Sequence, residues 1–283
     1  MNHQTLLQNW ESRQQEWLDA YANRTTDFVH GLLPEKAVTL SGHLVLETLA
    51  KRLGVATMQV ALMPGGRVAS PVAHHQDTHW LKRENMVGIN VRTIQSFWNV
   101  VKYALTLPRS QGSIHLLPMW EPGVVSSLYG MASWQINPAF FSAELAHLVP
   151  SLNTVEKQLK AVVNLLHAMG KTVGMDVIPH TDRYSEMALA QPQYFEWLQR
   201  KGDQIIDHRA HLHEAVQGAI MSWLVRNGAA IPGLTFPHET AMFFGQEFPE
   251  AERLKVLFGL PAQYRERTDS TVVFGGLALP ARL

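Results

Sequence analysis

The chain has 283 residues, of which 46% are hydrophobic, which is enough for a large buried core. Lys plus Arg and Asp plus Glu each number 24, so the formal net charge of zero gives no electrostatic basis for binding nucleic acid or an anionic membrane. The absence of cysteine excludes disulfides, thiolate metal sites and a cysteine nucleophile. The sequence has no signal peptide and no apolar run of bilayer length, so we expect a cytoplasmic protein.

Residues 1–85 are predicted to form an N-terminal extension. Apolar residues at helical spacing indicate an accessory helix near the N-terminus. They are Leu7, Trp10, Trp17 and Tyr21. A second helix is predicted over residues 42–53 and a strand over residues 57–63, followed by a loop up to residue 85.

Three histidines and an aspartate lie within six positions of that loop. They are His74, His75, Asp77 and His79. Imidazole and carboxylate groups can ligate metals, but the spacing matches no recognised ligand pattern, which favours a polar loop without metal.

From Met86 onward, predicted strands and helices alternate. The strands are residues 86–91, 113–117 and 172–178. A helix capped by Thr93 connects the first two strands, with an apolar face that includes Phe97 and Val101. A second helix begins at a capping-box-like segment over residues 153–156 and ends at Gly170. This order implies parallel strands with helices packed outside, either in a doubly wound sheet or in a barrel.

Residues 194–201 and 204–226 are also predicted to be helical, whereas residues 229–283, rich in Pro, Gly and Phe, are not assigned. The second of these helices carries several histidines and acids. They are Asp207, His208, His211, His213 and Glu214. Together with the polar residues after the strand at 172–178, they give a rival hypothesis, a metal-dependent hydrolase.

The strand over residues 172–178 is apolar except for Asp176, and polar residues follow it. They are His180, Thr181, Asp182 and Arg183. Because α/β sheets bind ligands at the carboxyl ends of parallel strands, we expect function there.

The segment over residues 118–140 is longer than a plain crossover requires, and such loops are commonly functional. Its aromatic residues offer flat apolar faces for sugar rings, and two polar residues can hydrogen-bond with hydroxyl groups. They are Trp120, Tyr129, Trp134, Glu121 and Asn137. The alternative is that the aromatic rings only cover the end of the domain.

Two stretches of this region resemble the α-amylase family of glycoside hydrolases and transglycosylases. Ile-His-Leu-Leu-Pro-Met-Trp-Glu-Pro-Gly from Ile114, with Leu-Tyr-Gly-Met-Ala-Ser-Trp-Gln-Ile-Asn-Pro-Ala-Phe from Leu128, is similar to the second strand and its loop. Gly-Lys-Thr-Val-Gly-Met-Asp-Val-Ile-Pro-His-Thr from Gly170 is similar to the third strand. The match covers residues 86–196.

The resemblance implies an α/β fold of the TIM-barrel type, (β/α), over residues 86–283, acting on an α-glucan or a small α-glucoside without a cofactor or metal. It places the matching residues, Asp176 and approximately Tyr129, at the sugar end, and our leading hypothesis assigns sugar contacts there to a set of residues near the strand ends. They are Trp120, Tyr129, Asp176, His180 and Arg183. The family's Asn-His pair is His180-Thr181 here, and its catalytic carboxylates on strands four, five and seven have no counterpart. Asp182 and Glu121 are the remaining candidates for an acid or base.

A complete barrel takes roughly 250 residues, more than residues 86–283 supply. The predicted domain is therefore an incomplete barrel: the front part of a longer enzyme, a barrel completed by a second chain or by self-association, or a relative that has lost catalysis. Three functions remain open: a carbohydrate-active enzyme, a non-catalytic sugar-binding or interaction protein, and a metal-dependent hydrolase.

Overall fold

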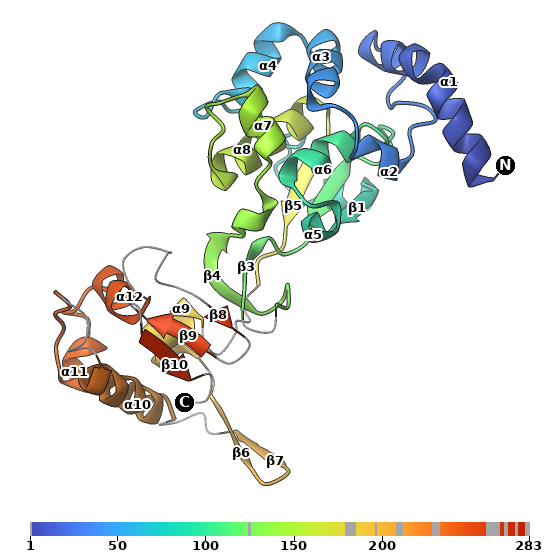
Figure 1. Ribbon diagram of the computed structural model, residues 1–283. Helices are drawn as coiled ribbons and strands as arrows, with labels where there is room; N and C mark the ends of the chain where they lie inside the picture. Colours follow the sequence, from blue (N-terminus) through green and yellow to red (C-terminus); the bar gives the residue numbers. More distant parts are fainter. Residues whose placement is uncertain are drawn as a thin grey trace. The chain divides into compact units, whose positions relative to one another are not determined.

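The computed structural model forms two compact units (Figure 1). The first contains residues 1–119 and 136–177, and the second contains residues 120–135 and 178–283. The residues that the structure describes are 2–123, 126–178, 185–195, 197–207, 212–227, 233–258, 267–268, 271–274 and 277–280. Within them, no helix has the length and apolar character needed to span a bilayer.

The first unit begins with helices. They are α1 (His3–Ala22), α2 (Pro34–Ala37), α3 (Gly42–Leu53) and α4 (Val55–Leu62), followed by a 3-10 helix (His79–Arg83). The predicted accessory helix and the helix over residues 42–53 are confirmed. The strand predicted over residues 57–63 is wrong, because most of that apolar run belongs to α4, which buries Met58 and Ala61 at helical spacing. A short apolar run does not by its period distinguish a strand from a helix.

A parallel sheet forms the centre of the first unit. Its strands are β1 (Met86–Ile89), β2 (Ser113–Leu116) and β5 (Thr172–Met175), in the order β1-β2-β5. The connecting helices are α5 (Val91–Ile94), α6 (Phe97–Ala104), α7 (Ala143–Leu148) and α8 (Val155–Ala168), with a 3-10 helix at Pro138–Phe140. These three strands were predicted, although each ends earlier than expected. Ile114 and Leu116 of β2 are fully buried.

The predicted TIM-barrel fold is wrong. In the described part of the chain the parallel sheet ends at β1 on one side and at β5 on the other, so it does not close. A TIM barrel needs eight parallel strands, each paired with two neighbours. The strand-helix alternation that suggested a barrel covers three strands, and the later strands that the structure describes belong to separate small sheets. The fold is therefore mixed α/β.

The second unit combines helices with short antiparallel strands. Its helices are α9 (Glu186–Ala190), α10 (Leu212–Asn227), α11 (Thr240–Phe243) and α12 (Glu250–Phe258), with a 3-10 helix at Pro192–Tyr194. Its strands are β3 (Trp120–Pro122), β4 (Met131–Ile136), β6 (Leu198–Lys201), β7 (Gln204–Asp207), β8 (Arg267–Thr268), β9 (Thr271–Phe274) and β10 (Leu277–Pro280). Leu189, Leu224, Phe243 and Leu257 belong to its buried core.

The helix predicted over residues 194–201 is wrong, and so is the start of the helix predicted over residues 204–226. Strands β6 and β7 pair in antiparallel fashion across Gly202 and Asp203. Gly202 has φ +60°, which suits a tight hairpin turn and not a helix. The predicted second helix is confirmed only for its later part, which is α10.

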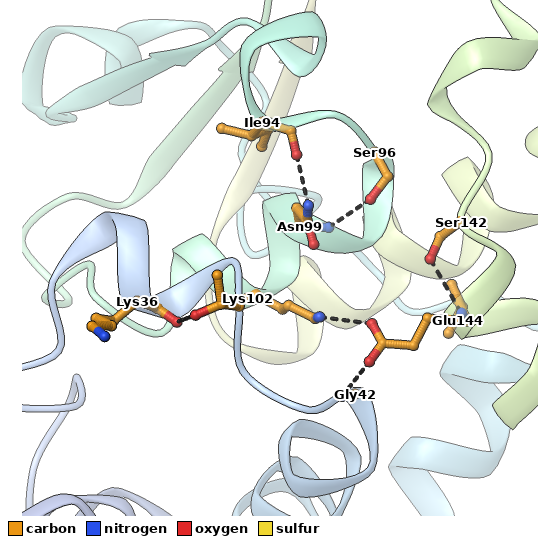
Figure 2. Close-up of polar contacts among 10 residues, drawn as sticks. Lys36, Gly42, Ile94, Ser96, Asn99, Lys102, Ser142 and Glu144 are labelled. Carbon is orange, nitrogen blue, oxygen red and sulfur yellow. Dashed lines mark hydrogen bonds and ion pairs between the residues drawn. The ribbon is translucent and has the colours of Figure 1, made fainter. Parts of the chain in front are cut away.

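A non-helical residue, Gln95, separates α5 from α6, so the cap of α6 lies later in the chain than predicted. Gln95 has φ +75°, outside the helical region, so the helix does not run through from Thr93. Ser96 caps α6 by accepting a hydrogen bond from the Asn99 N–H, and the Asn99 side chain donates to the Ile94 carbonyl (Figure 2). The prediction of Thr93 as the cap is therefore wrong, because the chain turns once more before the helix starts.

Glu144 of α7 joins three helices (Figure 2). One carboxylate oxygen lies 2.7 Å from Nζ of Lys102 on α6, and the other accepts a hydrogen bond of 2.7 Å from the Gly42 N–H at the start of α3. Lys102 is buried. Burial of Glu144 raises its pKa, but the Lys102 ammonium and the Gly42 N–H outweigh burial, so the pKa lies below its usual value.

Replacing Glu144 with glutamine is expected to weaken the acid sensitivity of folding. A carboxyl group with a lowered folded-state pKa stabilises the fold above its unfolded-state pKa, and this stabilisation is lost as the pH falls through the folded-state value. Since the Glu144 side chain is 43% exposed, we expect a contribution of about 1 kcal/mol or less. Urea unfolding at about pH 6 and about pH 3 measures it. Glu156→Gln, at an exposed glutamate of α8, is the control, and equal acid sensitivity of the two variants would contradict the prediction.

Candidate functional site

A histidine and an aspartate meet on the central sheet of the first unit. His115 lies in β2, and Asp176 directly follows the adjacent β5. Nε2 of His115 lies 2.8 Å from Oδ1 of Asp176. The two side chains are 30% and 31% exposed, so both are open to solvent and held in place by their neighbours.

Glycines flank His115 on both neighbouring strands. The register pairs it with Gly88 of β1 and with Gly174 of β5. Residues paired in this way project from the same face of a sheet, so the imidazole has no side chain beside it in its row. A Cβ atom at Gly174 would stand 2.8 Å from Nδ1 of His115, whereas one at Gly88 would meet only Cδ1 of Leu117, at 3.6 Å. The glycine at residue 174 is therefore what leaves room for the ring.

The face that carries His115 is the one turned away from the helices. Successive side chains of a strand alternate between faces, and the neighbours of His115 in β2, Ile114 and Leu116, are fully buried. The crossover helices α6 and α8 pack against each other, as expected when right-handed crossovers lie on one face of a sheet. The His115–Asp176 pair thus lies on the opposite face.

The hydrogen bond fixes the tautomer of a neutral His115. An ionised carboxylate can only accept hydrogen bonds, so Nε2 must carry the proton that it shares with Asp176. Nδ1 then holds a lone pair and is the proton-accepting atom of the ring. Within the described part of the chain, the bond to Asp176 is the only hydrogen bond that the side chain of His115 makes. An imidazole oriented by a carboxylate is a common arrangement for acid–base chemistry.

The structure accounts for one member of the polar cluster predicted at this strand end. Asp176 lies there, whereas His180, Thr181, Asp182 and Arg183 fall outside the described residues. His115 was not predicted as a site residue. A signal was present, because a histidine interrupts the apolar residues of its strand and strand glycines occur at both paired positions.

The segment predicted as a long loop contains the two-stranded β3–β4 hairpin of the second unit. The Gly123 N–H donates to the Gly130 carbonyl, and the Asn137 N–H donates to the Met119 carbonyl. These pairings run in opposite directions along the chain, which is an antiparallel arrangement.

An aromatic pair lies on this hairpin. The rings of Trp120 and Trp134 meet edge to face, with centroids 5.1 Å apart and planes at 75°. Trp134 is 44% exposed, and Tyr129, in the turn before β4, is 53% exposed. In this arrangement the edge of one ring meets the face of the other.

Glu121 faces the other way from this aromatic pair. Its Oε2 accepts a hydrogen bond of 2.7 Å from the hydroxyl of Ser133, which is buried. Since strand neighbours alternate, Glu121 and Ser133 lie on the face opposite Trp120 and Trp134. The predicted hydrogen-bonding residue Asn137 is buried and accepts a bond from the Ala139 N–H at the start of a 3-10 helix.

The predicted sugar-binding residues are thus divided between the units. Trp120, Glu121, Tyr129 and Trp134 belong to the second unit, and Asp176 belongs to the first.

The histidine clusters that suggested a metal hydrolase do not form a metal site in the part of the chain that the structure describes. The rings of His74 and His75 stack with centroids 4.4 Å apart, and His79 lies 3.8 Å from Asp77. Of the second cluster, Asp207 is in β7, His213 and Glu214 are in α10, and His208 and His211 lie outside the described residues. No family model, curated protein or solved structure matches this chain.

Proposed function

We propose that the chain is a carbohydrate-active protein that binds α-glucosides on the tryptophan face of the β3–β4 hairpin. The observation that carries the proposal is the edge-to-face pair of Trp120 and Trp134, with Trp134 44% exposed. An aromatic face outside the core suits a ligand that has apolar C–H surfaces as well as hydroxyl groups.

The charge of the hairpin supports a neutral ligand. Residues 119–137 contain no lysine or arginine and a single acidic residue, Glu121. A surface for nucleic acid or another polyanion would need cationic groups beside its aromatic rings. A sugar needs none. The resemblance of this segment to the second strand and loop of the α-amylase family narrows the expected sugar to an α-glucan or a small α-glucoside.

A non-catalytic sugar-binding protein is the second candidate, and the position of Glu121 favours it. This carboxylate lies on the hairpin face opposite the tryptophan pair and bonds to Ser133. An acid or base that acts on a sugar stacked on Trp134 would have to reach the same face. As part of the same proposal we place the protein in the cytoplasm, because a chain without cysteine needs no oxidising compartment.

Replacing Trp134 with alanine is expected to weaken the binding of maltoheptaose roughly tenfold or more, because the substitution removes an exposed ring of the aromatic pair. Titration calorimetry with the full chain measures the dissociation constant. Tyr194→Ala is the matched control, since Tyr194 is an aromatic residue of the same unit, outside the hairpin and 78% exposed. Equal affinity of Trp134→Ala and wild type, or no binding by wild type, would overturn the proposal.

Release of reducing sugar separates the two candidates. An enzyme whose acid or base is Glu121 would release sugar from maltoheptaose and would lose that activity in Glu121→Gln. A binding protein would bind the sugar without release, and Glu121→Gln would bind it with unchanged affinity.

A further inference from the structure

We propose that two copies of this chain associate through the solvent-exposed face of α4, packed in antiparallel fashion about a two-fold axis at Gln59. Helix α4 belongs to the first unit, whereas the tryptophan pair belongs to the second. Association through α4 is therefore independent of sugar binding on the hairpin. The exposure of the helix, its lack of charge and the position of Gln59 carry the inference.

Helix α4 exposes an apolar stripe to solvent. It packs against α3 and α8 (Figure 1), and it buries Met58 and Ala61. The exposed residues on its other side recur at intervals of four, in two adjacent rows, so they form one stripe along the helix. They are Val55, Ala56, Gln59, Val60 and Met63. Val55, Val60 and Met63 are 66%, 40% and 55% exposed, which leaves much apolar surface in water.

The stripe and its surroundings in the sequence carry no charge. Residues 53–66 contain no Asp, Glu, Lys, Arg or His. A surface helix normally places charged side chains on its solvent side, and a helix that is apolar on all sides is usually buried. A neutral surface is its own electrostatic complement. Since the formal net charge of the chain is also zero, two copies can approach without mutual repulsion.

Gln59 is the polar residue of the stripe, and it lies at the middle. It is four residues from Val55 and four residues from Met63. A two-fold axis here sets Gln59 opposite its own copy and Val55 opposite the Met63 of the second chain. A primary amide both donates and accepts, so two glutamines can bond to each other. Against a purely aliphatic partner the same amide would be buried without a hydrogen bond, which costs stability.

The helix dipole favours the antiparallel arrangement. Helix α4 has no acidic residue in its first turn and no basic residue in its last turn to offset its partial charges. Antiparallel packing brings ends of opposite partial charge together, whereas parallel packing brings like ends together. An eight-residue helix is about 12 Å long and buries less than the roughly 1,200 Å² of a stable complex. The dimer is therefore weak and forms as the concentration rises.

Sedimentation equilibrium of the full chain over a series of concentrations tests the inference. Wild type is expected to pass from monomer to dimer. Val60→Lys is expected to weaken the dimer about tenfold or more, because each dimer would bury two unpaired ammonium groups. Val225→Lys, at a valine of α10 that is 46% exposed, is the matched control and is expected to dimerise as wild type does. A wild type that stays monomeric, or equal dimerisation of Val60→Lys and wild type, would overturn the inference.

Cross-linking tests the position of the two-fold axis, and a chain without cysteine suits it well. Gln59→Cys is expected to form a covalent dimer on mild oxidation, because the two new thiols meet at the axis. Val55→Cys is the control in the same stripe. Its two copies lie about 12 Å apart along the helices, beyond the roughly 4–7 Å that a disulfide spans between Cα atoms. Cross-linking of Val55→Cys as fast as that of Gln59→Cys would contradict the antiparallel pairing.

Two further measurements separate a second copy from other uses of exposed apolar surface. Trp134→Ala removes an exposed ring of the hairpin and is expected to leave the dimer unchanged. Loss of the dimer in that variant would place the interface on the hairpin and contradict the inference. A wild type that stays monomeric and binds phosphatidylcholine vesicles, with binding lost in Val60→Lys, would also contradict it, because α4 would then face a lipid surface.

Discussion

Replacement of Arg253 with methionine is expected to lower the free energy of unfolding of the second unit by about 3–5 kcal/mol. Arg253 of α12 is only 2% exposed. Its guanidinium donates hydrogen bonds to four backbone carbonyls, at 2.8 to 3.0 Å. They belong to Ala190, Phe243, Gly245 and Phe248. Methionine fills similar space but donates no hydrogen bond, so these carbonyls would lose the donors that replace water.

Arg226→Met is the matched control for this measurement. Arg226, on α10, also donates to a backbone carbonyl, that of Ser222 at 3.0 Å, but it is exposed. Water can replace an exposed bond, so a change within about 0.5 kcal/mol is expected. Guanidinium denaturation of both variants measures the difference. A loss in Arg253→Met no larger than that in Arg226→Met would show that the buried bonds do not stabilise the fold.

Replacement of Lys171 with methionine is expected to cost about 2–4 kcal/mol. Lys171 directly precedes β5 and is 3% exposed. Its Nζ donates to the carbonyls of Leu107, Pro108 and Gln111, at 3.2, 2.6 and 2.9 Å. All three ammonium protons are thereby used in closing the turn between α6 and β2. Lys160→Met, at an exposed lysine of α8, is the control and is expected to change stability little.

The cost of Lys171→Met is expected to depend on pH. Burial lowers the pKa of Lys171 from 10.5 to about 8, against the opposing effect of Asp27 and Glu84. Between these two values the unfolded chain keeps a proton that the folded chain has released, so wild-type stability rises with pH in this window. The variant lacks this contribution, and the difference from wild type should therefore widen from pH 8 to pH 10. A difference that stays constant would contradict the prediction.

Sequence patterns predicted the strands of the central sheet well, but the prediction that this sheet belongs to a barrel was wrong. The strands at residues 86–89, 113–116 and 172–175 have apolar runs bounded by helix signals, and Gly170, with φ +81°, ends α8 as expected. Those signals lie within a few residues of the element they define. Closure of a barrel depends on pairing between strands that are distant in the sequence. The three consecutive strand–helix repeats predicted here carry no evidence for such pairing.

The candidate site was predicted only in part, because it too depends on pairing between strands that are distant in the sequence. Asp176 stands out as the only charge in an apolar run, but its partner His115 lies on another strand and is brought to it by the register. The orientation of Glu121 away from the tryptophan pair depends on where β3 begins, which the residues 118–140 do not reveal on their own. The hairpin at Gly202 was not predicted, because Gly202 and Asp203 form a two-residue turn between runs whose composition also suits a helix.

The division of the chain also bears on how the protein is made. The β3–β4 hairpin belongs to the second unit but is encoded between β2 and β5 of the first. Because a ribosome delivers the chain from its N-terminus, Trp120 and Trp134 emerge before residues 178–283 of their own unit exist. For the same reason, no single proteolytic cut separates the two units completely, since the chain passes between them after residues 119, 135 and 177.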